Sequence, residues 1–191
     1  MDLNEQTATD HWILDKEHHP LNIRIIDTYL DPNNFIISVT RLKTHNAVVA
    51  TLSVKNMVMG SPLNDYENNE KPKMHQGTKE INFNLFLIAQ HVQPQLAVLD
   101  GLEGMEGNGP IRGTPVEHGV ALASMDFIAA DRIGTELMGI DFSDVGYLTY
   151  CAQAGMGQSD REKIEIIGPD PSAYKKTYKL HDKVDRQLQW K

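Results

Sequence analysis

The apolar positions of the chain fall into short runs that predict strands. Residues 22–30 and 35–42 are rich in β-branched and other apolar side chains, and the turn-forming sequence Asp-Pro-Asn-Asn lies between them at residues 31–34. This order predicts two strands that could pair as a hairpin. Further strands are predicted for the apolar runs at residues 96–99, 119–123 and 163–167.

Between these runs the apolar residues recur at helical spacing. Asn46 can cap a helix over residues 47–59, which Gly60 ends. Residues 78–92 carry an apolar stripe, although residues 81–86 also fit an alternating strand. Similar stripes predict helices over residues 126–138 and 141–154. The alternation of strands and helices indicates an α/β fold, with a layered sheet that is mostly parallel or mixed and has flanking helices.

The length of 191 residues fits one main domain. We expect a lead-in segment at residues 1–20, a single α/β domain at residues 21–170, and a C-terminal tail or helix at residues 171–191. Residues 61–77 are polar and contain two prolines, which predicts a mobile surface loop.

Charge and composition exclude several classes of function. The formal net charge of −8 argues against binding to nucleic acid through phosphate neutralisation. No apolar run approaches the ~18 residues of a membrane span, so we expect no membrane partner. One cysteine, Cys151, cannot form a disulfide or hold an iron–sulfur cluster within the chain. A polar, acidic start without a secretory pattern favours a cytoplasmic protein.

The first candidate site is the Gly-rich acidic segment at residues 100–110. Its glycines would let the backbone approach a ligand closely, and it follows a predicted strand, where ligands bind in open α/β sheets. Asp100, Glu103, Glu106 and Asn108 add oxygen atoms that suit a divalent cation or acid–base chemistry. A tight turn with solvated acids is the structural alternative.

The second candidate site is an anion site around residues 43–56. Lys43 and His45 leave a predicted strand and enter a helix N-terminus, where free N–H groups favour an anion. Lys55 follows on the same predicted helix beside apolar residues, and burial there would lower its pKa towards acid–base or nucleophilic work. A lysine stem on the surface of a capped helix is an equally open interpretation.

Two further acids have structural interpretations. Asp131 lies within the apolar stripe of a predicted helix, where an unpaired carboxylate is costly to bury. We expect it to hold the Gly-rich segment from behind, although a functional role stays open. Asp126 is a candidate cap for the same helix.

The sequence also resembles a known family in three blocks. Residues 43–56 (KTHNAVVATLSVKN) are similar to the "KTH … TLSxKN" segment of the domain of unknown function 362 family. Residues 98–110 (VLDGLEGMEGNGP) resemble its "DG-x-x-GMEGNGP" block, and residues 123–139 continue the likeness. The resemblance covers most of residues 35–168 and implies an α/β domain of uncertain activity, without the N-terminal part of the family domain. Members are often joined to iron–sulfur modules, which implies an iron–sulfur protein as a partner.

These features together predict a small-molecule enzyme domain that binds a carboxylate or phosphate ligand, with a divalent metal as a further expectation. The alternative is a non-catalytic ligand-binding or accessory domain that works with an iron–sulfur partner. The expected roles are catalysis by Lys55, Asp100 and Glu106, binding by Lys43, His45, Asn56, Gly107, Asn108 and Gly109, and metal ligation by Glu103 and Glu106.

Overall fold

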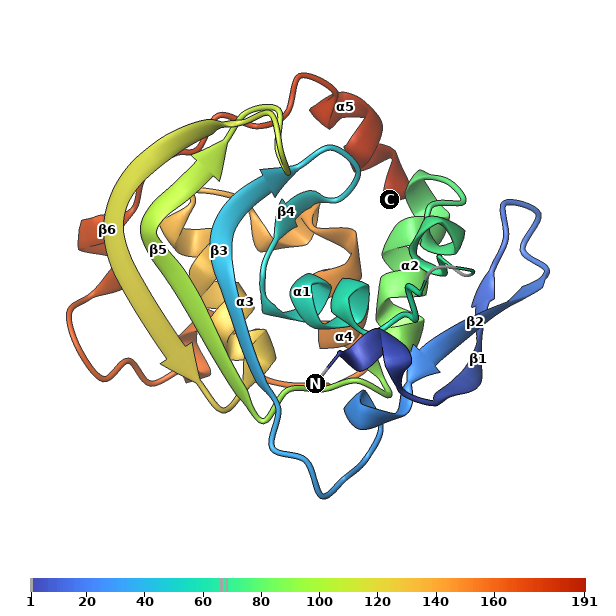
Figure 1. Ribbon diagram of the computed structural model, residues 1–191. Coiled ribbons are helices and arrows are strands. Elements are labelled where there is room, and N and C mark those ends of the chain that lie inside the picture. The colour runs from blue at the N-terminus through green and yellow to red at the C-terminus, as the bar shows by residue number, and fades with distance from the viewer. Residues whose placement is uncertain (1, 66, 68) are drawn as a thin grey trace.

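The computed structural model describes residues 2–65, 67 and 69–191, and it places their strands in two sheets (Figure 1). The smaller sheet is an antiparallel pair of β1 (Ala8–Leu14) and β2 (Pro20–Ile26). The larger sheet has the order β4-β3-β5-β6. Its strands are β3 (Ile37–His45), β4 (Val49–Thr51), β5 (Leu96–Glu106) and β6 (Thr114–Ser124). β3 and β5 are parallel and the outer pairs are antiparallel, so the sheet is mixed.

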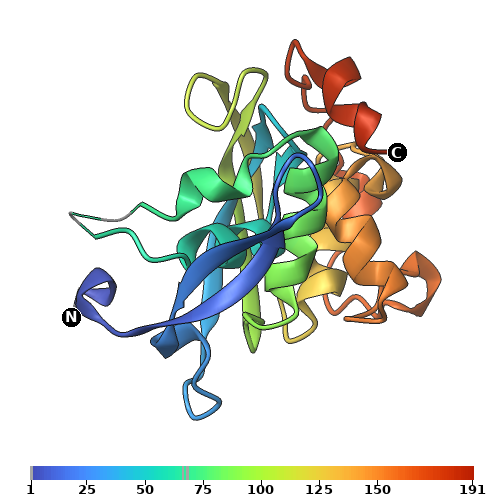
Figure 2. The same cartoon turned by 90° about the vertical axis from the view of Figure 1, so that its right-hand side faces the viewer.

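A layer of helices lies between the larger sheet and the β1–β2 hairpin (Figures 1 and 2). The helices are α1 (Ser53–Gly60), α2 (Thr78–Ala89), α3 (Phe127–Leu137), α4 (Gly146–Gln153) and the short α5 (Val184–Gln187). Single 3₁₀ turns occur at Leu3–Glu5, Asp27–Tyr29, Lys71–Met74, Phe142–Asp144, Arg161–Lys163, Pro171–Tyr174 and Leu188–Trp190. The arrangement confirms the predicted α/β class.

The core forms where the apolar stripes of the helices meet one face of the larger sheet. Ile81, Leu85 and Ile88 of α2 are completely or almost completely buried, which confirms a helix rather than a strand at residues 81–86. Alternate residues of the central strands, such as Leu42 and Leu99, pack into the same core. Their period of two is the one expected for strands that are covered on one face.

The predicted hairpin between residues 22–30 and 35–42 is wrong. β2 pairs instead with β1, which forms within the segment that we expected to be a lead-in. β3 pairs with β5 and β4. The buried Ile13 of β1 and Ile23 of β2 explain the difference, because this short hairpin covers the outer side of the helix layer.

Residues 47–59 are not one helix. β4 occupies Val49–Thr51, and α1 begins only at Ser53. Val49 has a φ of +66°, in the left-handed region that is strained for a β-branched residue, so the chain turns sharply before β4. Lys55 therefore lies in the first turn of a shorter helix.

The Gly-rich segment is mostly strand rather than loop, because β5 continues to Glu106. A Cβ atom at Gly101 would lie 2.8 Å from Leu42 Cδ1, and one at Gly104 would collide with the Tyr178 hydroxyl group. These glycines therefore allow close packing within the sheet.

The predicted strand at residues 163–167 is also wrong, because the chain there pairs with no other described strand.

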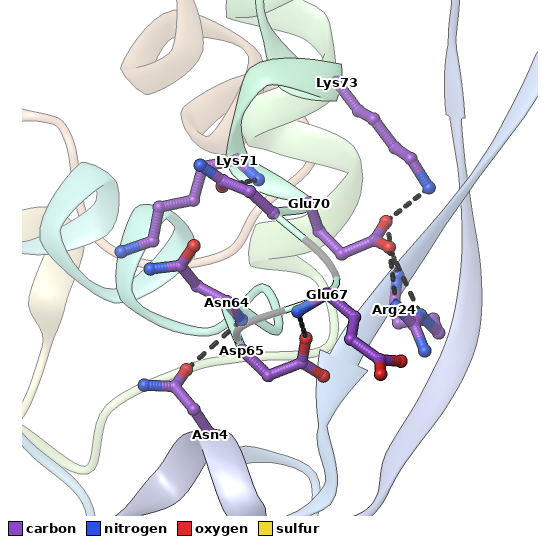
Figure 3. Close-up of polar contacts among 9 residues, drawn as sticks. Asn4, Arg24, Asn64, Asp65, Glu67, Glu70, Lys71 and Lys73 are labelled. Carbon is purple, nitrogen blue, oxygen red and sulfur yellow. Dashed lines mark hydrogen bonds and ion pairs between the residues drawn. The ribbon is translucent and has the colours of Figure 1, made fainter.

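The segment at residues 61–77 is anchored by a buried acid. Residues 66 and 68 lie outside the described residues, but Glu70 is only 4% exposed. It accepts hydrogen bonds from Arg24 Nε (3.2 Å) and Nη2 (3.1 Å), and it also forms an ion pair with Lys73 (Figure 3). Burial raises the pKa of Glu70, but the hydrogen bonds from Lys73 and Arg24 outweigh it, so the pKa lies below its ordinary value.

Replacing Glu70 with alanine should lower the free energy of unfolding by about 2 kcal/mol. Breaking a fully buried ion pair costs ~3–5 kcal/mol, but Arg24 and Lys73 are partly exposed and can be hydrated once the acid is gone. Urea unfolding at pH 7 measures the loss, and Glu67→Ala, at an exposed neighbour, is the control. The loss should shrink as the pH falls through the lowered pKa of Glu70, because the wild-type carboxylate is then protonated. Equal stabilities of the two variants would contradict this role.

Candidate functional site

The candidate site lies where β3 and β4 meet the start of α1. Lys43 and His45 are among the last three residues of β3, and Lys55 lies in the first turn of α1. Lys43 is directly opposite Thr51 on β4, so their side chains share one face of the sheet. The carboxyl ends of β3 and β5 and the C-terminal helix α5 lie at the same end of the molecule (Figure 1).

His45 is a buried, neutral imidazole. Only 5% of the residue is exposed, and its Nδ1 accepts a hydrogen bond from the Ala47 backbone N–H at 3.0 Å. Burial, and after it the charges of Lys55, His75, Lys43 and His181 in that order, together lower the pKa of His45 to about 2. Because Nδ1 is the acceptor, the proton of the neutral ring is on Nε2, which can donate a hydrogen bond to a ligand.

Lys55 is a buried cation without a counter-ion. It is 5% exposed and forms no hydrogen bond or ion pair with any described residue. Burial and, to a smaller extent, the charge of Lys43 together lower the pKa of Lys55 to about 8. A buried charge is normally paired, so the environment of this ammonium group lacks an anion.

Two hydroxyl groups near Lys55 in the sequence are also without partners. Thr51 Oγ1 and Ser53 Oγ are buried and form no hydrogen bond within the described chain. Buried polar groups are satisfied in the great majority of cases, so each unsatisfied group calls for an explanation. Hydroxyl groups without partners can donate hydrogen bonds to oxygen atoms of a ligand.

His75 completes the set of positive or potentially positive groups. It lies after the 3₁₀ turn at Lys71–Met74, and its pKa is lowered by burial and by the charge of Lys55, while a hydrogen bond with the Lys71 carbonyl opposes the shift. We call Lys43, His45, Lys55 and His75 the basic cluster. Sequence reasoning missed His75, because nothing in its spacing from residues 43–55 signals that the loop folds back onto them.

Asp131 positions α1 rather than the Gly-rich segment. Its two carboxylate oxygens accept hydrogen bonds from the backbone N–H groups of Ser53 (2.7 Å) and Val54 (3.0 Å). The residue is completely buried, and burial raises its pKa to about 7 despite these two hydrogen bonds. Asp131 therefore fixes the helix turn that carries Lys55, which differs from the predicted role.

The side chains of Asn56 and Asp126 form hydrogen bonds that hold elements of the fold together. The Asn56 side-chain amide donates to Ser38 Oγ at 3.1 Å and to the Val39 carbonyl at 3.5 Å, so it ties α1 to β3, and its role in binding stays a prediction. Asp126 caps α3 by accepting a hydrogen bond from the Ala129 N–H.

The acids of residues 100–110 are engaged outside the basic cluster. Asp100 accepts a hydrogen bond from the Leu102 N–H, and Glu103 forms an ion pair with Arg41 at 3.3 Å. Glu106 accepts from the Lys179 N–H, and Asn108 donates to Asp182. The structure therefore does not bring these side chains together with Lys55.

Gly107 and Gly109 pack beside the cluster on Thr44. The Thr44 hydroxyl group donates to the Gly107 carbonyl at 2.9 Å, and a Cβ atom at Gly109 would collide with the Thr44 carbonyl oxygen. These glycines let the loop lie against the end of β3, and this contact is the link between the two predicted segments.

Metal ligation by Glu103 and Glu106 stays a prediction. Among the described residues, the group of three or more potential ligands that lie close together is Asp15, Glu17 and His19, at the turn between β1 and β2.

Cys151 is completely buried, and burial and the charge of Asp131 raise its pKa to about 12, so it is not an activated thiol.

A hollow of about 680 Å³ lies away from the basic cluster, and none of the cluster residues lines it. It is bounded by β6, α3 and residues 164–174, and most of its lining side chains are apolar. The cluster is the better candidate for chemistry, because it combines burial with unpaired polar groups. No helix among the described residues is long and apolar enough to cross a membrane.

Comparison with known proteins identifies the family of this chain, and the description of that family names no activity. A family model described as "Domain of unknown function (DUF362)" matches residues 1–136, and so it also covers the residues before position 35. The thylakoid-associated protein sll1697 of a Synechocystis strain is 31% identical over 151 residues. That match covers 76% of this chain and 41% of the relative, so the chain spans less than half of that protein. No solved structure matches.

Proposed function

Since this chain belongs to the DUF362 family, a domain of unknown function, we propose that it binds a small carboxylate or phosphate ligand at the basic cluster. The observation that carries the proposal is Lys55, a residue only 5% exposed whose ammonium group has no counter-ion among the described residues. An anion would supply the missing partner. It would also accept hydrogen bonds from His45 Nε2 and from the unsatisfied Thr51 hydroxyl group.

The same groups support acid–base chemistry on a bound anion. A lysine with a pKa of about 8 is mostly protonated at neutral pH, yet it gives up its proton far more readily than an ordinary lysine. The neutral His45 can donate a hydrogen bond to an oxygen that gains negative charge during a reaction. Lys55 is therefore the proposed proton donor, and Lys43 and His45 are the proposed binding groups.

The proposal leaves out the acids of residues 100–110. Their carboxylates are paired with Arg41 or with backbone N–H groups, and none of these contacts involves the basic cluster. A divalent cation is also poorly suited to the cluster itself, because Lys43 and Lys55 would repel it.

Titration calorimetry with acetate and inorganic phosphate at constant ionic strength tests the proposal. Wild-type protein should bind at least one of these anions, and Lys55→Met should weaken binding tenfold or more, which corresponds to about 1.4 kcal/mol. Lys43→Met should act in the same direction. Lys16→Met, which removes a charge from the exposed turn between β1 and β2, should leave binding unchanged. Equal affinities for wild-type protein and Lys55→Met would refute the proposed site.

A further inference from the structure

A shallow hollow beside the basic cluster carries a second group of unpaired cations. It has a volume of about 210 Å³, and it lies between the segment around His75, the start of α2 and the C-terminal helix α5. The charged or titratable residues in its lining are His75, Lys183 and Arg186. None of the described residues that line it is acidic.

The cations of this hollow lack acidic partners. Neither Lys183 nor Arg186 forms an ion pair within the part of the chain that the structure describes. The neighbouring Asp182 is engaged elsewhere, since it forms an ion pair with Lys179 and accepts a hydrogen bond from Asn108. In a chain with a net charge of −8, a hollow lined only by positive and neutral groups is an unusual concentration of charge.

Three residues of the lining link the hollow to the basic cluster. His75 belongs to both, and the charge of Lys55 acts on its pKa. Ala47 lines the hollow and donates its backbone N–H to His45 Nδ1. Gln187 also lines the hollow, and its side-chain amide donates to the His45 carbonyl at 2.9 Å.

We propose that the ligand of this protein carries two anionic groups, one held by Lys43 and Lys55 and the other by Lys183 and Arg186 in the hollow beside His75. The inference rests on the proposed function, and it narrows the ligand class to dicarboxylates and phosphorylated carboxylic acids. At about 210 Å³ the hollow is smaller than the ~300 Å³ or more of typical small-molecule pockets, so it suits one anionic group rather than a whole cofactor.

The chemistry of the two subsites differs. Lys55 is only 5% exposed and its ammonium group has no ion-pair partner among the described residues, so it should gain most from a compact anionic group. Lys183 and Arg186 are exposed and hydrated, and Arg186 can bind a carboxylate or a phosphoryl group in a bidentate manner. Lys183 and Arg186 should therefore add affinity and specificity for the second anionic group of the ligand. Binding of the first anionic group should depend on Lys55.

Calorimetric titration of the full chain with acetate, malonate, succinate and glutarate at fixed ionic strength tests the inference. For wild-type protein we expect at least one diacid to bind tenfold or more tightly than acetate, with an optimum chain length. The double variant Lys183→Ala/Arg186→Ala should lose this advantage, and its affinity for acetate should stay within about twofold. A double variant with the same change of charge, Lys16→Ala/Lys175→Ala, involves residues that line neither subsite and should behave as wild-type.

The outcomes separate the two proposals. Equal binding of acetate and every diacid by wild-type protein, or an unchanged diacid advantage in Lys183→Ala/Arg186→Ala, would overturn the second subsite and leave the first intact. Diacid binding that is lost in the double variant but unaffected by Lys55→Met would instead overturn the proposed role of the basic cluster. An unchanged urea midpoint of the double variant ensures that lost binding does not reflect unfolding of α5.

Discussion

Replacing Lys55 with methionine should make the protein more stable, by about 3 kcal/mol at pH 7. The pKa of Lys55 falls from 10.5 to about 8 on folding. Each unit of such a shift corresponds to about 1.4 kcal/mol, so the folded state carries a penalty of this order whenever the lysine is charged in both states. Methionine has a similar length and no charge, and it should pack beside the apolar residues of α1 without that penalty.

The pH dependence of this gain provides a sharp test. Between pH 8 and pH 10.5 the unfolded chain holds the Lys55 proton and the folded chain does not, so the wild-type protein recovers stability relative to the variant as the pH rises. Urea unfolding of both proteins at pH 7 and pH 9.5 should show a difference that shrinks. Lys43→Met, at a half-exposed residue, should change stability by only ~0.5 kcal/mol. A variant at Lys55 that is less stable than wild type at pH 7 would show that the lysine has a stabilising partner.

Replacing Asp131 with alanine should have an effect of similar size and opposite sign. The change leaves the N–H groups of Ser53 and Val54 buried without an acceptor, and each such group costs ~1–3 kcal/mol. We expect a loss of about 3 kcal/mol in the free energy of unfolding, measured by urea or thermal unfolding. Anion binding should weaken as well, because the turn that carries Lys55 loses its anchor.

Asp131→Asn is the matched control. Its single side-chain oxygen can accept from one of the two N–H groups, so we expect about half of the loss seen for alanine. The pKa of Asp131 rises from 3.8 to about 7 on folding, so the stability that its protonated form contributes is fully present below pH 3.8 and is lost as the pH rises from there to about 7. The deficit of Asp131→Asn should therefore be larger at pH 5 than at pH 8. A stability for Asp131→Ala equal to that of wild type would mean that α1 holds its position without the carboxylate.

The parts of the fold that the sequence predicts well are those with long periodic stripes. α2 and α3 bury the residues that their spacing selects, because a stripe of several turns specifies one face of a helix. The chain around residues 47–51 is harder to predict. Val48, Val49 and Ala50 are all buried, so they offer no alternation, and the left-handed φ of Val49 has no glycine to mark it.

The candidate site can likewise be predicted from the sequence only in part. Lys43, His45 and Lys55 are close in the sequence, and the structure brings them together even though the helix between them is shorter than expected. His75 and Arg186 join the site through tertiary folding alone, and no local spacing predicts that contact. Residues 100–106 were predicted to be a loop because a strand that contains glycine and charged residues has the same composition as a ligand loop, and the site roles of their acids stay predictions.

The contact of Gln187 couples the site to the end of the described chain. Its side chain accepts a hydrogen bond from the Val49 N–H at 3.0 Å and donates to the His45 carbonyl, so one amide secures both sides of the strained turn between β3 and β4. Short terminal elements open locally at a lower free energy than the core does. Detachment of α5 would therefore release His45 and the second cation group in one step, while the sheet and the helix layer stayed folded. Loss of ligand affinity would then precede denaturation, and the working lifetime of the site would be set by its weakest attached segment rather than by the stability of the whole domain.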